Sequence, residues 1–295
     1  MKSIELLKKR GYVSEFRSKS ISDDDLEMIN EIILEASDKY GEGIKIENLE
    51  GDFVYKNLLD YEYKYGKMVK APRYIAFTTT DVLKGYEKTG FIGEWIISKL
   101  IENGIDAKWL EINDHDEKLF KTFNFEEGSY LVNFIAIGYG IKESNIAKLL
   151  KNKYKNSIKN LTSMGYSDTM DMKTDSDIIY KLSIHEFVYN DEFGHMFNDN
   201  KLERTGLQRV FQSLHLAPTI TNRQLWRILI HEEKLFIVFV SDDKIAKIEA
   251  GILRFYLGEA LMNNGIKTRW YEVDNLNLEQ YKFPESSFVP GYFTY

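Results

Sequence analysis

The stretch of the chain best suited to chemistry runs from Leu216 to Ile228 and reads LAPTITNRQLWRI. It places a proline, two threonines, an asparagine and a glutamine directly before a tryptophan. A helix that ends at such a stretch exposes backbone N–H groups and short polar side chains, which can hold a planar heteroaromatic ligand by its hydrogen-bonding edges. The same residues also suit a turn into a strand, in which Asn222 and Gln224 satisfy the local backbone. The residues alone leave both interpretations open.

The elements that would position this stretch belong to an internal sequence repeat. Residues 90–109, GFIGEWIISKLIENGIDAKW, align without a gap with residues 251–270, GILRFYLGEALMNNGIKTRW. The apolar runs before them, residues 73–81 and 234–243, match at about the same offset. Each half is therefore predicted to form a strand, a turn and a long helix, followed by a short apolar segment. Because symmetric homodimers place ligand sites between subunits, a fused pair can keep one such site and lose the other.

The two long helices are expected to bury one face and to end alike. The spacing predicts six inward positions: Ile97, Leu100 and Ile101 in the first copy, and Gly258, Leu261 and Met262 in the second. The Asn-Gly pairs at 103–104 and 264–265 predict the helix ends, because both residues tolerate a left-handed backbone.

Further local signals place other elements. Ser22 with Asp25 three residues later predicts the start of a helix. A strand is expected over residues 130–137. A second-half helix must end by Ala217, because the residue before Pro218 is pushed out of the helical region.

Composition excludes several classes of protein. The chain has 295 residues, 43% of them hydrophobic and 14% aromatic, enough for two domains and for aromatic surfaces at an interface or a planar ligand. A net charge of -7 argues against nucleic-acid binding. The absence of cysteine excludes disulfides, thiolate metal sites and cysteine nucleophiles.

Targeting, metal and nucleotide motifs are also missing from the sequence. Its N-terminus, MKSIELLKKR, lacks a signal-peptide run, and no apolar stretch is long enough to span a membrane, so we expect a cytoplasmic protein without a membrane partner. The five histidines show no metal-ligand spacing. Glycine-rich phosphate loops and nucleophile elbows do not occur, which leaves kinase and hydrolase interpretations without support.

The 216–228 stretch resembles the Ala-Pro-Ser-x-x-Asn-x-Gln-Pro-Trp signature of the nitroreductase superfamily of FMN-dependent oxidoreductases. The matching positions are Ala217, Pro218, Thr219, Asn222, Gln224 and Trp226. In the first copy, LLKKRGYVSEF is similar to the superfamily's basic N-terminal arm, with Lys9 and Arg10 on its basic pair, and residues 71–112 are similar to its strand and dimer-core helix. The whole chain resembles a branch of tandem nitroreductases, in which two shortened copies share one chain.

The resemblance implies an α+β fold of two tandem nitroreductase-like copies that form an intramolecular pseudo-dimer. It implies a first copy over residues 1–141 with the basic phosphate arm, a connection over 142–177 and a second copy over 178–295 with the Pro-Thr-x-x-Asn-x-Gln-x-Trp loop. FMN would lie between the copies, and its phosphate would meet a cationic pair. The cofactor-binding residues carried over are Lys9, Arg10, Tyr12, Ser14, Pro218, Thr219, Ile220, Asn222 and Gln224.

The second possible site, with the roles of the two copies exchanged, lacks the residues that the resemblance requires. Lys181, Ser183 and His185 stand where copy two would present its arm, in a segment whose Ile184–Phe187 echoes Val13–Phe16. The first copy has only residues 37–41, SDKYG, after its first long helix, so one flavin per chain at most is expected.

The retained site departs from the pattern at Tyr12, Ser14 and Leu225, where the superfamily has Ser, a second cation and Pro. Losing one cation from a phosphate site weakens binding by about 1–3 kcal/mol. Arg17, or the lysines after Gly140 (Lys142, Lys148 and Lys151), could compensate, although such lysines also suit a solvated basic face.

The implied activity is that of an NAD(P)H oxidoreductase that reduces a nitroaromatic or quinone-like acceptor, in a monomer with pseudo-dimeric halves. Because the cofactor would carry the chemistry, no catalytic side chain is assigned. The alternative is a non-catalytic, flavin-binding or flavin-free interaction protein on a degenerate nitroreductase fold, and the three departures keep it open.

Overall fold

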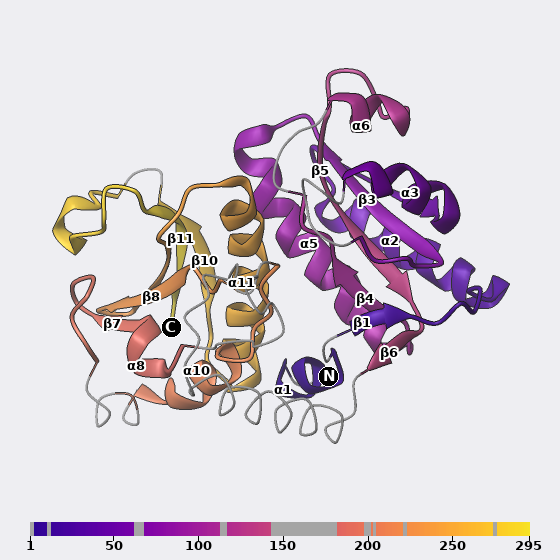
Figure 1. The fold of residues 1–295 in the computed structure, drawn as a ribbon. Coiled ribbons are helices and arrows are strands. Elements are labelled where there is room, and N and C mark those ends of the chain that lie inside the picture. Colours follow the sequence, from indigo (N-terminus) through magenta and orange to yellow (C-terminus); the bar gives the residue numbers. More distant parts are fainter. Residues whose placement is uncertain are drawn as a thin grey trace, which may run out of the picture.

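A computed structural model of the chain describes residues 3–10, 13–61, 68–112, 117–142, 182–197, 202, 205–220, 223–273 and 276–295. In these ranges the chain forms two main β-sheets, each packed against helices, and two long helices lie side by side between them (Figure 1). Nearly all of the predicted connection over 142–177, and the predicted start of the second copy, lie outside the described residues.

The first half holds a four-stranded antiparallel sheet. Its elements are α1 (Ser3–Arg10), β1 (Val13–Phe16), α2 (Asp23–Tyr40), β2 (Ile44–Glu50), α3 (Gly51–Leu58), η1 (Leu59–Tyr61), β3 (Arg73–Thr79), α5 (Val82–Glu102), β4 (Asp106–Trp109), α6 (Glu117–Thr122), β5 (Tyr130–Gly138) and β6 (Gly140–Lys142). The strand order is β2-β3-β5-β4, and β1 pairs with β6 in a separate ribbon. Alternate strand residues face α2 and α5 on one side and α3 and α6 on the other.

The second half holds a five-stranded sheet. Its elements are α8 (Ile184–Phe187), β7 (Val188–Asn190), α10 (Gln208–Leu214), β8 (Trp226–His231), β9 (Lys234–Phe239), α11 (Lys244–Asn263), β10 (Arg269–Glu272), η2 (Glu279–Tyr281) and β11 (Phe288–Thr294). The order is β7-β8-β9-β11-β10, with β7 parallel to β8 and the other pairs antiparallel. Apart from β7, the order and the antiparallel pairing repeat those of the first sheet, with β8, β9, β11 and β10 in the places of β2, β3, β5 and β4.

The sequence signals at the helix ends are confirmed. Asn103 and Asn264 cap α5 and α11, and the glycines after them have φ angles of 83° and 77°. At the start of α2, the Asp25 N–H donates to Ser22 Oγ at 3.2 Å. One inward assignment is wrong, because Met262 is 57% exposed. Among the described residues, no helix combines the length and apolar character needed to cross a membrane.

Helices α5 and α11 approach at two glycines, which match each other in the repeat. A Cβ at Gly90 would lie 1.9 Å from the Ile248 carbonyl oxygen, and a Cβ at Gly251 would lie 1.9 Å from the Glu87 carbonyl oxygen. The offset that relates Gly90 to Gly251 also relates Glu87 to Ile248, so the two contacts are reciprocal, as in an isologous interface. Each helix therefore needs a residue without a side chain where it meets the other.

We predict that Gly90→Ala and Gly251→Ala each lower the free energy of unfolding by about 1–3 kcal/mol, because the new methyl group meets backbone that must move. Gly258→Ala in α11 is the matched control, since its methyl group would meet the Phe293 ring at 3.2 Å, and a ring can shift. Chemical denaturation measures all three variants. Equal effects at the three positions would contradict a glycine-specific contact.

Candidate functional site

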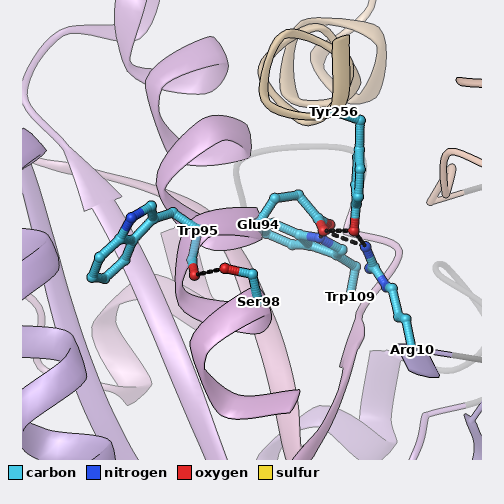
Figure 2. Close-up of polar contacts among 6 residues, drawn as sticks. All are labelled: Arg10, Glu94, Trp95, Ser98, Trp109 and Tyr256. Atoms are coloured by element: carbon cyan, nitrogen blue, oxygen red, sulfur yellow. Dashed lines mark hydrogen bonds and ion pairs between the residues drawn. The ribbon is translucent and has the colours of Figure 1, made fainter. Parts of the chain in front are cut away.

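Two of the segments named from the sequence contact α11. The first is the arm, α1, which packs against α5 and α11. Arg10 ends this helix and is only 8% exposed. Its guanidinium turns inward to Glu94 of α5 and Tyr256 of α11, as Figure 2 shows.

Glu94 is the centre of this cluster and is fully buried. Its Oε2 accepts from Arg10 Nη1 and, at 2.9 Å, from the Tyr256 hydroxyl (Figure 2). Its Oε1 accepts from Trp109 Nε1 at 2.7 Å. Arg10 Nη1 also lies 2.9 Å from the Tyr256 hydroxyl oxygen. Donors from α1, β4 and α11 therefore converge on one carboxylate of α5.

The electrostatics of the cluster favour a charged Arg10 and a neutral Tyr256. Burial alone would lower the pKa of Arg10, but Glu94 and Tyr256 outweigh it and raise that pKa. Burial raises the pKa of Tyr256 against the opposing effect of Arg10, so its hydroxyl stays protonated and can donate to Glu94.

The second segment is the loop that follows α10. The helix ends at Leu214, as Pro218 requires, and the Ala217 N–H donates to the Leu214 carbonyl at 2.8 Å. The Ile220 N–H then donates to Glu249 Oε1 at 2.6 Å. Glu249 belongs to α11 and is 1% exposed, so a buried carboxylate fixes this loop to the helix.

Gln224 holds the far end of the loop. Its φ of 44° lies in the left-handed region, which costs energy for a residue other than glycine. The side chain is buried, and its Oε1 accepts from the Leu182 N–H at 2.9 Å. His215 Nδ1 lies 2.8 Å from the Leu182 carbonyl oxygen. Two side chains that flank the loop thus bind both backbone groups of Leu182.

Arm and loop meet the same face of α11. Glu249, which holds the loop, and Tyr256, which contacts Arg10, are seven residues apart on this helix. Seven residues make almost two full turns, so the two side chains point the same way, about 10 Å apart along the axis.

The other residues named from the sequence are placed as follows. Lys9 is exposed, and Ser14 Oγ donates to the Ile141 carbonyl at 3.2 Å. Tyr12 and Asn222 lie outside the described residues. Thr219 Oγ1 and Gln224 Nε2 are buried and have no hydrogen-bond partner among the described residues.

A hollow of about 610 Å³ lies beside β1. Ser14 and Arg17 line it together with Tyr55, Lys70 and Arg73, among others. None of the described residues of the 218–224 loop, and none of α11, is among its lining residues.

The first half has no comparable loop after its own long helix. Helix α2 continues to Tyr40, whose ring packs edge-on against Phe91 and Trp95 of α5, with ring centres 5.5 Å and 5.8 Å away. Lys39 and Lys99 place their ammonium groups over the Trp95 ring. Aromatic packing thus covers Phe91 and Trp95, and Lys88, which the repeat matches to Glu249, donates to the Glu42 carbonyl at 3.1 Å.

Three residues of the site were not predicted from the sequence: Glu94, Tyr256 and Glu249. A carboxylate on the inward face of a long apolar helix is the signal that points to the first and third, since buried carboxylates need partners. Tyr256 carries no such signal, because an inward tyrosine ordinarily belongs to the core.

A family model described as "Putative TM nitroreductase" matches residues 2–179, more than half of the chain, and the chain belongs to this family. A crystal structure from Thermotoga maritima MSB8, described as a "putative nitroreductase", has a TM-score of 0.54 at 14% identity and covers 100% of this chain and 93% of its own. It shares the fold.

A second solved structure, an FMN-dependent nitroreductase from Clostridium difficile R20291, covers 58% of this chain and 96% of its own at 17% identity, with a TM-score of 0.41. A comparison with curated proteins finds no match.

We predict that Arg10→Ala lowers the free energy of unfolding by about 3–5 kcal/mol, because it leaves Glu94 charged and buried without its cation. The double variant Arg10→Ala with Glu94→Gln should lose less, since neither charge remains. Thermal and chemical unfolding of these two variants and of Glu94→Gln alone measure this coupling. Lys121→Ala, which removes an exposed ion pair with Glu117, is the control and should leave stability unchanged. Additive effects at positions 10 and 94 would contradict the coupling.

Proposed function

We propose that this protein is an FMN-dependent NAD(P)H oxidoreductase of nitroreductase type, with one FMN between the N-terminal arm and the 218–224 loop. The observation that carries the proposal is the placement of both groups on one face of α11. Arg10 contacts Tyr256 there, and the Ile220 backbone is fixed to Glu249 two turns away. An arm from one half and a loop from the other are the pair that the family resemblance assigns to a single flavin.

The two halves are proposed to form a tandem pseudo-dimer. The repeated strand order and the reciprocal contacts of Gly90 and Gly251 support this organisation. In a homodimer the same contacts would join two subunits, and here one chain supplies both sides.

The residues of the loop suit a flavin ring. Thr219 Oγ1 and Gln224 Nε2 are buried polar atoms without a partner among the described residues, and buried polar atoms ordinarily have one. A planar ring with several hydrogen-bonding edges would supply it. The arm fits the phosphate less well, because Glu94 already neutralises the charge of Arg10 and Lys9 is exposed.

In this proposal the chain binds FMN, orients it and shields it from solvent. Pro218, Thr219, Ile220, Asn222 and Gln224 would contact the ring system, and Lys9, Arg10, Tyr12 and Ser14 would lie at the phosphate end. FMN, when bound, supplies the hydride chemistry between a nicotinamide and a nitroaromatic or quinone-like acceptor. Glu249 fixes the loop backbone, and Glu94 orients the Arg10 guanidinium. No side chain needs to act as an acid or base.

A second candidate function is a non-catalytic binding protein on the same fold. Two contacts favour it: the buried pairing of Arg10 with Glu94, and the hydrogen bond from Ser14 to the Ile141 carbonyl. Both tie groups of the predicted phosphate end to the protein itself.

Asn222→Ala should weaken FMN binding about tenfold, because one good hydrogen bond to a buried ligand contributes about 1.4 kcal/mol. Fluorescence titration with FMN measures the dissociation constant, and NAD(P)H oxidation with a quinone acceptor measures turnover. Asn263→Ala is the matched control, since the Asn263 amide donates to the Glu259 carbonyl at 2.7 Å near the end of α11.

Unchanged FMN affinity in Asn222→Ala would contradict the assigned loop. FMN binding without turnover would favour the non-catalytic protein.

A further inference from the structure

Glu94 is a buried carboxylate at the end of the site where the proposed function needs positive charge. Its Oε2 accepts from Arg10 Nη1, and both side chains are almost fully excluded from solvent. A buried ion pair has no net charge, so little attraction remains for a phosphate dianion at this point.

We propose that Glu94 limits the affinity of this chain for the phosphate of FMN, because it neutralises Arg10, a buried cation of the arm. This inference rests on the proposed function and assigns Glu94 the role of an affinity-determining residue. The family resemblance assigns only the basic arm to the phosphate end and gives no role to the position of Glu94.

The contacts around Glu94 make the competition specific. Its Oε1 accepts from Trp109 Nε1 at 2.7 Å, and its Oε2 also accepts from the Tyr256 hydroxyl at 2.9 Å. These neutral donors fix the carboxylate from β4 and α11, so it cannot swing away when a phosphate approaches. The guanidinium must then be shared between Glu94 and the ligand.

The substitution Glu94→Gln removes the negative charge of the side chain and keeps its size and shape. It retains an oxygen that can accept from Trp109, and it removes the negative charge that holds Arg10. Without that charge beside it, the Arg10 guanidinium can pair fully with the phosphate of FMN. Comparison of FMN with riboflavin isolates this effect, since the two ligands share the ring and ribityl chain and differ by the phosphate.

The experiment measures dissociation constants for FMN and riboflavin by quenching of flavin fluorescence. Glu94→Gln should bind FMN about tenfold more tightly than the unaltered chain, and its affinity for riboflavin should change less than twofold. Glu87→Gln is the matched control, because it removes another carboxylate from α5, one paired with Arg254 at 3.0 Å. Its ratio of FMN to riboflavin affinity should equal that of the unaltered chain.

The charge-balanced double variant, Arg10→Ala with Glu94→Gln, tests the inference even if the single variant fails to fold. Because the two charges cancel, removing both should change the ratio of FMN to riboflavin affinity less than threefold.

Three outcomes would overturn the inference. They are equal gains for FMN and riboflavin in Glu94→Gln, weaker FMN binding in that variant, and a tenfold loss of the ratio in the double variant. If the unaltered chain binds FMN and any of these occurs, the inference fails and the proposed function stands. If neither the unaltered chain nor Glu94→Gln binds either flavin, the proposed function fails, and the inference with it.

Discussion

The close contact of α5 and α11 is the constraint on which the rest of the structure depends. Gly90 and Gly251 let each helix backbone lie against a carbonyl of the other, and no side chain fits between them. This contact fixes the spacing of the two halves, so that α1 can reach both helices at once. Arg10 of the first half can therefore reach the face of α11 that also holds the 218–224 loop.

Charge at this face is balanced inside the protein. Arg10 and Glu94 form a buried pair that joins α1 to α5, and Tyr256 extends the hydrogen bonds to α11. A pair of this kind specifies how three helices meet, because either partner alone would be costly to bury. In the same pair, Glu94 neutralises a cation of the proposed phosphate site. We therefore propose that one contact both holds the helices together and limits the affinity for the ligand.

Much of the fold could be predicted from the sequence, because its signals are local or repeated. The Asn-Gly helix ends, the Ser22 cap and the end of α10 before Pro218 depend on a few adjacent residues each. The sequence echo between Val13–Phe16 and Ile184–Phe187 does not extend to the structure, since the first is a strand and the second a helix. The partner of Arg10 could not be predicted, because it lies 84 residues away and only the folded chain brings it near.

The count of FMN molecules per chain tests the central claim most directly. Arm and loop come together on one face of α11, while Tyr40 packs against Phe91 and Trp95 of α5. Equilibrium dialysis with FMN, read as flavin absorbance against protein concentration, should therefore saturate at one FMN per chain. Saturation at two, or no uptake at any concentration, would contradict a single site built by the two halves.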